Sequence, residues 1–449
     1  MEQSLMDKLT ILADSAKYDV ACTSSGASRA ARAGTLGSCY APGCCHAFTA
    51  DGRCVSLLKV LMSNCCAFDC SYCVNRKSND VPRATFSPRE LAELTIEFYR
   101  RNYIEGLFLS SAVLGTPDYT TERMLSVLRL LRNEYHFGGY IHAKTIPGTS
   151  PELIRQMGFL ADRLSVNVEL PSEQSLHLLA PDKGRHSIFR PMKQISVAGE
   201  ESKKELTLYR HAPKFAPAGQ STQMIVGASP ETDYHILQLS EGMYQKYSLK
   251  RVFYIPVSDD TRLPALDTKP PLLREHRLYQ ADWLLRFYQF RADEILDKDN
   301  QSFNPYLDPK CNWAVQHYGL FPVDINRASF EMLLRVPGIG PKSARRIRDA
   351  RRLSDLGLDE LKRMGVVLKR AQYFITCRGF SGAHPGRGSA GRERITRALI
   401  DPNVFSAGAE QLSLFAPPAV DRLVAQGVPP RAAQRMVREE AVQCLARAL

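Results

Sequence analysis

Three closely spaced cysteines constrain this chain more than any other feature. Cys66, Cys70 and Cys73 lie in the segment NCCAFDCSYCVN with a C-x3-C-x2-C spacing. Three such thiolates can bind three irons of a [4Fe-4S] cube and leave the fourth iron open. The apolar run Cys54–Met62 directly before them predicts a strand, and α/β barrels carry their chemistry on loops that follow strands. We therefore expect an iron–sulfur site on this loop.

A structural zinc site is the alternative interpretation of these thiols. Structural zinc normally takes four ligands, often arranged as two pairs. Cys65 could complete a set of four, but its side chain should point away from that of its neighbour Cys66.

The same residues resemble the signature of the radical S-adenosylmethionine (SAM) superfamily, C-x3-C-x-aromatic-C, with Tyr72 as the aromatic residue next to the cofactor. The resemblance implies that the methionine end of SAM chelates the fourth iron. It also implies that an electron from the cluster cleaves SAM to a 5'-deoxyadenosyl radical, which removes a hydrogen atom from the substrate. An electron donor such as flavodoxin or ferredoxin is implied as well.

Six strand-like runs alternate with helical segments after residue 53. A capping box with proline, Ser87-Pro88-Arg89-Glu90, opens one of the helices. This alternation predicts an α/β fold with a parallel sheet and right-handed crossovers, and the resemblance implies a partial (β/α)6 barrel. The predicted strands are Cys54–Met62, Gly106–Val113, Gly139–Ile146, Asp162–Leu170, Thr222–Gly227 and Arg251–Val257.

Polar residues at the ends of these strands are candidate SAM contacts. Ser110 and Ser111 follow the second strand, where the superfamily has a small-residue segment that contacts the amino group of SAM. Glycines followed by an acid are commoner there, so the chain departs from the usual form. Asn167 and Glu169 end the fourth strand, and the resemblance implies that Glu169 binds the ribose. Strand-end hydrogen bonds and helix caps are the alternative roles.

Two further segments have less definite roles. His142 and Lys144 share one face of the third strand, and we expect Lys144 to point into the barrel. Residues 180–220 are basic and show little periodicity, which predicts a solvated loop or a substrate loop.

The chain has 12 cysteines, and its N-terminus lacks a basic start followed by an apolar core. No stretch approaches the ~18 apolar residues of a membrane span. We therefore expect a cytoplasmic protein with reduced thiols and no membrane partner. Cysteines before the main motif could hold an auxiliary Fe-S cluster or be ordinary thiols; they are Cys22, Cys39, Cys44, Cys45 and Cys54.

A second motif lies in residues 324–348, DINRASFEMLLRVPGIGPKSARRIR. It resembles the helix-hairpin-helix module of DNA-binding and DNA-repair proteins. Gly338 and Gly340 would let the backbone approach a phosphate, which the first amides of the helix beginning at Pro341 would then hold. Such a contact positions DNA without reading its sequence.

Charge is concentrated around this motif. The chain carries +12, and residues 321–400 hold 17 Lys and Arg against 7 Asp and Glu, a surplus of +10. Lys342, Arg345 and Arg346 lie directly after the hairpin. The pattern favours nucleic-acid binding, although a solvated basic face or a protein contact is also compatible with it.

The C-terminal region contains the segment QLSLF, which resembles the peptide by which bacterial repair proteins and polymerases bind the sliding clamp. Its candidate contact residues are Gln411, Leu412, Leu414 and Phe415. A tethered apolar peptide can order in a hydrophobic groove.

The combination of motifs resembles a bacterial family of radical SAM proteins that modify or repair DNA, over residues from about 15 to 380. We expect four parts: a cysteine-containing leader packed on the barrel (1–50), the barrel (51–300), a helix-hairpin-helix nucleic-acid-binding domain (318–380) and a flexible tail with the clamp-like peptide (381–449).

Three other functions remain open. An RNA- or tRNA-modifying radical SAM enzyme would use the same phosphate contacts. A non-radical iron–sulfur DNA-binding protein or glycosylase would need four cysteines after the hairpin, where this chain has Cys377 and Cys444. A binding protein whose cluster senses redox state is the third.

Overall fold

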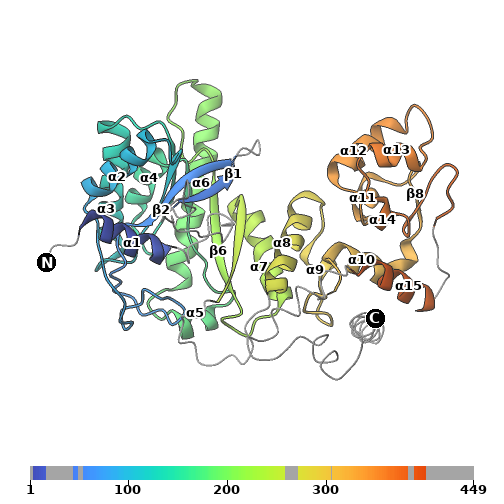
Figure 1. Cartoon of the computed structure of the whole chain (residues 1–449), viewed down its shortest axis with the longest axis horizontal. Helices are drawn as coiled ribbons and strands as arrows, with labels where there is room; N and C mark the ends of the chain where they lie inside the picture. Colours follow the sequence, from blue (N-terminus) through green and yellow to red (C-terminus); the bar gives the residue numbers. More distant parts are fainter. Residues whose placement is uncertain are drawn as a thin grey trace, which may run out of the picture. The chain divides into compact units, whose positions relative to one another are not determined.

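The computed structural model describes residues 4–16, 54–257, 272–304, 306–382 and 389–400, and the backbone of the strand at 44–48. The chain divides into two compact units (Figure 1). Unit 1 comprises residues 1–231 and 242–269, and unit 2 comprises residues 232–241 and 270–449. The side chains of the five N-terminal cysteines proposed for an auxiliary cluster, and the whole clamp-like peptide, lie outside the described residues.

Unit 1 is built on a seven-stranded sheet in the order β1 to β7. Strands β2 to β7 are parallel, and β1 pairs antiparallel with β2. The six-stranded parallel half-barrel predicted from the sequence is therefore confirmed, whereas β1 was not predicted. The strands are β1 (Cys44–Phe48), β2 (Cys54–Leu61), β3 (Gly106–Ser110), β4 (Tyr140–Lys144), β5 (Arg163–Ser165), β6 (Gln220–Val226) and β7 (Arg251–Pro256).

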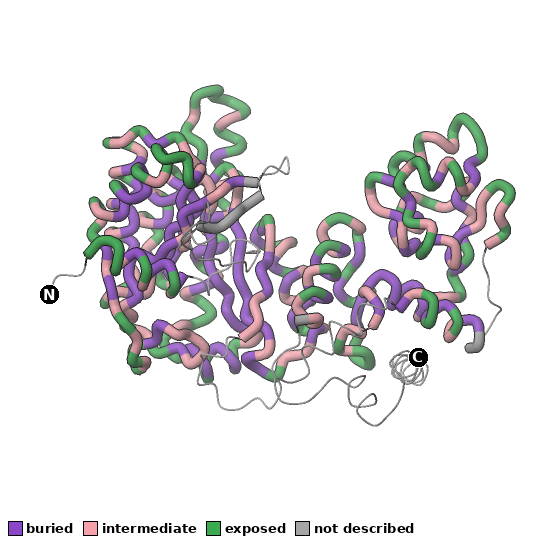
Figure 2. Tube along the Cα trace, viewed as in Figure 1, coloured by how far each residue is buried: buried purple, intermediate pink, exposed green. Residues whose placement is uncertain are grey.

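Helices follow the strands and cover the outer face of the half-barrel, so the strands are mostly buried while the helices keep an exposed side (Figure 2). The capping box expected before α2 is present, because the Ser87 hydroxyl accepts from the Glu90 amide and the Glu90 carboxylate accepts from the Ser87 amide. Helices of this part are α1 (Leu5–Ser15), α2 (Pro88–Arg100), α3 (Pro117–Arg129), a π-helix (Leu130–Glu134), α4 (Pro151–Leu160), α5 (Glu173–Leu179), α6 (Arg185–Leu208) and α7 (Asp233–Tyr247).

The predicted loop at residues 180–220 is wrong over most of its length, because α6 occupies Arg185–Leu208. The helix buries Ile188, Met192 and Ile195, which recur at helical spacing. Charged residues between them dilute this stripe, and Pro191 inside the helix removes the usual sequence signal of a helix interior.

The interior of the half-barrel changes character along the strands. At the amino ends it is closed by a small apolar cluster of Val55, Leu57 and Phe108, with Tyr140 packed against it. At the carboxyl ends it opens into a cavity. This polarity is typical of α/β barrels, whose sites lie at the carboxyl ends of the strands.

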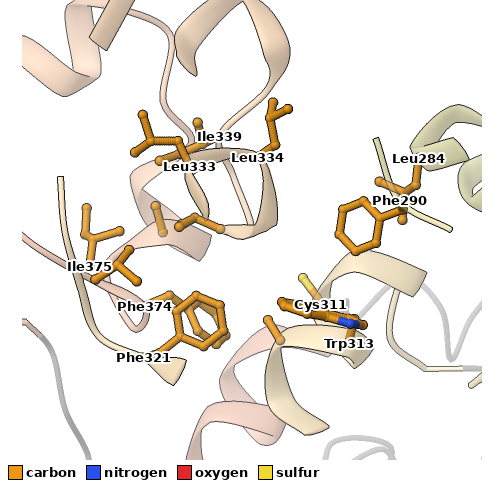
Figure 3. Packing of buried hydrophobic residues seen from close by; sticks show 14 of the residues in the cluster. Leu284, Phe290, Cys311, Trp313, Phe321, Leu333, Leu334, Ile339, Phe374 and Ile375 are labelled. Atoms are coloured by element: carbon orange, nitrogen blue, oxygen red, sulfur yellow. The ribbon is translucent and has the colours of Figure 1, made fainter. Parts of the chain in front are cut away.

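Unit 2 is mainly helical, with a two-stranded parallel sheet of β8 and β9. Its core brings Leu333, Leu334 and Ile339 of the hairpin region together with Phe374 and Ile375 (Figure 3). The elements are α8 (Leu272–Phe287), α9 (Ala292–Ile295), α10 (Pro309–Gln316), a 3-10 helix (Tyr318–Leu320), β8 (Val323–Asp324), α11 (Phe330–Arg335), α12 (Pro341–Ala350), α13 (Leu358–Arg363), α14 (Leu368–Ala371), β9 (Ile375–Thr376) and α15 (Ser389–Leu399).

Among the residues that the structure describes, no helix has both the length and the apolar character needed to span a bilayer.

Candidate functional site

The cavity at the carboxyl ends of the strands gathers most of the residues that the sequence pointed to. One side is formed by the cysteine loop and the others by strand ends of β3 to β7. The predicted residues on its wall are Cys66, Cys70, Cys73, Tyr72, Ser110, Ser111, Asn167 and Glu169, together with Lys144. Residues separated by about a hundred positions thus meet at one site.

The cysteine loop follows β2 and is held in shape by the side chain of Arg83. Its guanidinium donates hydrogen bonds to four loop carbonyls, including those of Asn75 (2.9 Å), Arg76 (2.7 Å) and Asn79 (2.7 Å), the fourth being that of Asn64. A planar fork of donors suits this task. The hydrogen bonds from Arg83 therefore hold the loop conformation through contacts within the protein itself.

Burial makes two of the three cysteine thiols hard to ionise in the protein alone. It raises the pKa of Cys70, and it raises the pKa of Cys73 to about 12. The nearby Lys183 ammonium acts in the opposite direction on the pKa of both thiols. Because iron binds the thiolate form, binding of a metal cluster must displace these protons.

Cys65 has different surroundings from the three cysteines of the motif. It does not line the cavity, and its sulfur lies 3.8 Å from the Thr85 hydroxyl, which donates to it. The prediction that Cys65 points away from Cys66 agrees with this placement.

Lys183 is a wall residue that the sequence analysis missed. Its Nζ lies 3.0 Å from Glu169 Oε1 and 3.2 Å from the Tyr72 hydroxyl. The turn that carries it is tied to the cysteine loop, because the Asp69 amide donates to Asp182 Oδ2 at 2.9 Å. Burial acts to lower the pKa of Lys183, but the pKa is raised well above the ordinary value because Glu169, Tyr72 and Cys70 together outweigh burial. A lysine in the Pro181–Gly184 turn, next to Asp182, gave no distinctive sequence signal.

Glu169 occupies an unusual backbone conformation at the cavity. Its φ is 66°, in the left-handed region that L-residues rarely adopt, and its backbone continues the pairing with β6 through Gln223 and Ile225. The Asn167 side-chain amide donates to its carboxylate at 3.3 Å. Strain of this kind persists where surrounding contacts over-determine it, as at ligand sites.

Of the remaining candidates, Ser110 is buried and the Ser111 hydroxyl donates to the Ala112 carbonyl at 2.8 Å. Lys144 lies on the cavity wall, as expected. His142 shares its strand face but does not line the cavity: its ring packs edge-on against Phe108 and its Nε2 lies 3.0 Å from the Ser165 hydroxyl. Burial lowers its pKa well below the ordinary value, so His142 is a neutral interior residue at neutral pH.

The wall fits an iron–sulfur cluster with a polar organic ligand beside it. Three thiols face one cavity, and an ammonium next to them can offset the negative charge of bound thiolates. Asn167 Oδ1 is buried and has no hydrogen-bond partner among the described residues, so it can accept one from a ligand. Within the described part of the chain, no three acidic, His or Cys side chains converge on a single metal ion; a cube does not require this, since each thiolate binds its own iron.

In unit 2, α11 and α12 form the expected hairpin. Gly338 has φ +85°, and a Cβ at this position would lie 2.5 Å from the Val367 carbonyl oxygen, so only glycine fits. The Ile339 carbonyl accepts a 2.6 Å hydrogen bond from Lys310 Nζ. Gly340 is the N-cap of α12, whose first turn begins with Pro341. The loop is thus fixed by close backbone packing and by a buried lysine.

The cations after the hairpin are exposed. Lys342, Arg345 and Arg346 lie on the outer side of α12, while Ala344 and Ile347 face the core. The Ser343 hydroxyl and the Arg346 guanidinium donate to the Met364 carbonyl. The first N–H groups of a helix lack carbonyl partners within it, so this end of α12 combines such amides, a positive dipole end and exposed cations.

The expected second half of the module is also helical. It consists of the short helices α13 and α14, joined through Gly365, which has φ +86°. Val367 donates its amide to the Gly338 carbonyl at 2.9 Å, which ties this second turn to the first hairpin.

Comparison with known proteins agrees with both sites. Residues 60–210 match the radical SAM superfamily, and residues 323–350 match the helix-hairpin-helix motif. None of the curated proteins matches the chain.

Several solved structures are similar at low identity. The [FeFe]-hydrogenase maturase HydG from Carboxydothermus hydrogenoformans has 11% identity and a TM-score of 0.39, with 50% of each chain covered. A radical SAM methyltransferase from Sphaerobacter thermophilus has 15% identity and a TM-score of 0.33, covering 52% of this chain and 68% of the other. The methyltransferase TsrM from Kitasatospora setae has 10% identity and a TM-score of 0.35, covering 86% and 60%.

This chain spans about half the length of the first of these structures. The half-barrel, its cysteine-lined cavity and the match over residues 60–210 lead to one conclusion: residues 60–210 carry a radical SAM superfamily domain, which implies a [4Fe-4S] cluster and SAM as cofactors, and unit 2 carries a helix-hairpin-helix motif.

Proposed function

We propose that this chain is a radical SAM enzyme that modifies or repairs DNA. The observation that carries the proposal is the presence, in one chain, of a cysteine-lined cavity in unit 1 and a phosphate-binding type of hairpin with exposed cations in unit 2. Superfamily chemistry alone leaves the substrate open. The hairpin supports a nucleic acid, and the resemblance to DNA-modification and DNA-repair proteins supports DNA.

Each group of residues has its own task in this proposal. When bound, the cluster and SAM supply one-electron chemistry that removes a hydrogen atom from the substrate. Cys66, Cys70 and Cys73 hold the cluster, while Lys183 and Glu169 shape the neighbouring wall for SAM. The hairpin holds a phosphate of the strand through backbone amides and the cations of α12.

The substrate nucleotide must leave a duplex before this chemistry can reach it. A base inside the helical stack is inaccessible to a cavity enclosed by strand ends and loops, so flipping or a single strand is required. The site therefore favours a base or sugar presented out of the stack. Repair of a lesion, methylation and thiolation are all compatible with such a substrate.

Further partners follow from the same proposal. An electron donor such as flavodoxin or ferredoxin would reduce the cluster in the cytoplasm, and the peptide Gln411–Phe415 would recruit the sliding clamp. Deletion of residues 411–415 should abolish capture of purified clamp without changing DNA affinity; retained capture would remove the clamp from the proposal.

Anaerobic reconstitution tests the activity directly. The full chain is loaded with iron and sulfide, then mixed with SAM, dithionite and either undamaged DNA, damaged DNA or tRNA. We expect 5'-deoxyadenosine to form in a cluster-dependent reaction and to increase with DNA more than with tRNA. A preference for tRNA would favour an RNA-modifying enzyme. No SAM cleavage by a protein with an intact cluster would favour a non-radical iron–sulfur DNA-binding protein.

Nucleic-acid binding by the hairpin is tested through its salt dependence. Each phosphate contact contributes about 0.9 to the slope of log K against log salt for duplex DNA. Replacement of Lys342, Arg345 and Arg346 by Ala should lower this slope by up to about 3. The matched control is Lys203→Ala with Lys204→Ala, two exposed cations of α6 in unit 1; an equal loss in this control would point to non-specific charge effects.

A further inference from the structure

The hairpin of unit 2 lies on the rim of a cavity. Gly338, Ile339 and Gly340 line this hairpin cavity, together with Ser343 of α12. Its volume is about 580 Å³, within the range of roughly 300–1,000 Å³ that small-molecule sites occupy. A phosphate held by the hairpin would therefore lie beside a cavity. A flat surface at this place would allow contacts to the nucleic-acid backbone alone.

The wall of the hairpin cavity away from the hairpin is aromatic. Tyr279 and Trp283 of α8 line it, with Tyr288 directly after the helix. Trp283 is 52% exposed and packs at a tilt against Phe287, which is 45% exposed, with 4.3 Å between the ring centroids. Two large rings left open to solvent lose burial free energy, and exposed aromatic rings are the usual platforms on which nucleic-acid bases stack.

The aromatic wall and the hairpin approach each other closely. A Cβ at Gly340 would lie 3.3 Å from the Tyr288 hydroxyl, so the absence of a side chain there leaves room for the phenol. Lys310 bridges the two sides, because its Nζ donates to the Ile339 carbonyl at 2.6 Å and lies 4.6 Å from the Tyr288 ring centroid. The hairpin, which could hold a phosphate, and the aromatic side chains, which could stack on a base, therefore line the same cavity.

Polar groups also line the cavity. The Arg370 guanidinium lies 3.0 Å from Asp308 Oδ2, and both residues line the cavity. A guanidinium and a carboxylate at the edge of an apolar slot are the donors and acceptors that a base edge requires. The pair places both donors and acceptors at the edge of the cavity, which suits a base edge better than an apolar peptide.

We propose that the hairpin cavity takes one unstacked nucleobase of the strand whose phosphate the hairpin holds, with the base against Trp283. This inference rests on the proposed function and deepens it, because it makes the preferred ligand a single strand or an opened duplex. It gives unit 2 a recognition role beyond the backbone contact.

The two tryptophans of the chain make the proposal measurable. Trp283 is 52% exposed and Trp313 is 4% exposed, so ligand-dependent quenching of indole fluorescence reports mainly on Trp283. The full chain is titrated with single-stranded DNA, with the same strand carrying one central run of abasic residues, and with its duplex. We expect strong quenching by the single strand, weaker quenching by the duplex and the weakest by the abasic strand, which carries equal charge.

Substitutions separate stacking from folding. Trp283→Ala should weaken single-strand binding about 5- to 150-fold, the range that stacking of one base spans, and Trp283→Phe should restore most of the affinity. Tyr103→Ala, at an aromatic residue of unit 1 that is 58% exposed, is the matched control and should bind normally. Unchanged melting of the variants would confirm that they fold.

The outcomes distinguish this inference from the proposed function. If Trp283→Ala binds the single strand like the wild type, or if the abasic strand binds and quenches equally, base stacking in the cavity is excluded while DNA binding by the hairpin stands. If the full chain binds neither DNA nor RNA, both proposals are wrong. Protection of Trp283 from acrylamide in the free chain would show that a protein segment fills the cavity, which also contradicts the inference.

Discussion

The cysteine loop and the hairpin are both short loops that follow a regular element, yet they are built by opposite means. In the cysteine loop, side chains do the holding: Arg83 binds four carbonyls, and the reactive thiols are buried or half-buried. The hairpin is held mainly by close packing of its glycine backbone, together with a hydrogen bond from the buried Lys310 to one of its carbonyls. The charges of Lys342, Arg345 and Arg346 are exposed. A buried site can bind its group almost independently of salt, whereas an exposed one depends on it.

The comparison also separates two kinds of ligand. Buried thiols with raised pKa values bind a group that displaces protons and stays resident. Exposed cations with free amides bind a polyanion that arrives and leaves, since much of their affinity comes from released counterions. The two loops are therefore suited to a cofactor and a substrate, respectively.

The largest expected effect is loss of the cluster when a cysteine of the cysteine loop is replaced. Cys66→Ala, Cys70→Ala or Cys73→Ala should each abolish stable cluster binding, because each thiolate holds one iron. Iron content and the visible absorption of anaerobically reconstituted protein measure this. Cys65→Ala is the matched control and should keep its cluster, since this side chain does not line the cavity.

DNA affinity should be unchanged in Cys66→Ala if the two loops act separately. Loss of both cluster binding and DNA affinity in Cys66→Ala would show that the two loops do not act separately. Retention of a full cluster after two of the three substitutions would contradict the assignment of ligands.

The second effect concerns the ion pair behind the cysteine loop. Lys183→Met leaves the Glu169 carboxylate buried without the ammonium 3.0 Å away, and breaking a buried pair costs about 3–5 kcal/mol. We expect a lower melting temperature for unit 1 and a poorer cluster yield. Lys77→Met, at an exposed lysine of the same loop, should change neither. Restoration of stability in Lys183→Met with Glu169→Gln would identify the uncompensated charge as the cause.

The third effect concerns the backbone of the hairpin at Gly338. Gly338→Ala forces an L-residue into a left-handed conformation, at a cost of roughly 1–2 kcal/mol, and adds a clash with the Val367 carbonyl. Melting and DNA affinity should both fall. Gly319→Ala, where a Cβ would meet nothing within 4 Å, is the control. Normal DNA binding by Gly338→Ala would show that the hairpin backbone does not hold the phosphate.

Local sequence signals were sufficient for much of the architecture. The six parallel strands, the capping box at Ser87 and the bounds of the hairpin follow from periodicity, cap residues and glycine spacing, which act over a few positions. These signals also placed the three cysteines and the strand-end residues on one cavity, because parallel strands bring their carboxyl ends together.

Two parts of the molecule gave no readable signal, and both depend on long-range contacts. Lys183 is 111 positions from Tyr72, whose hydroxyl it contacts, and its turn, PDKG, looks like an ordinary polar loop. Lys310 is 29 positions from the Ile339 carbonyl that it binds. A lysine is usually solvated, so composition alone cannot show that a fold will bury one.

The smallest expected effect is a pH dependence that arises beside the hairpin. Burial lowers the pKa of Lys310 to about 7, although Asp308 nearby acts to raise it and Arg335 and Arg370 act with burial. In the unfolded chain this lysine has its usual pKa of about 10.4. Between these values the unfolded state binds more protons, so the stability of unit 2 should rise with pH, by at most about 1.4 kcal/mol per unit.

Thermal unfolding between pH 7 and 8 tests the sign, because this window lies below the pKa of about 8.5 that the Cys311 thiol has in the unfolded chain, so that the thiol is mostly protonated in both states. Lys310→Met should remove the dependence of stability on pH, and Lys342→Met, at an exposed lysine, should keep it.

If a phosphate binds beside the hairpin, it favours the charged form of Lys310. DNA binding near pH 7.5 should then take up a proton, which calorimetry in buffers of different ionisation enthalpy would detect. Binding without proton uptake would place the phosphate too far from Lys310 to interact with it, and the base-stacking cavity would lose its link to the hairpin.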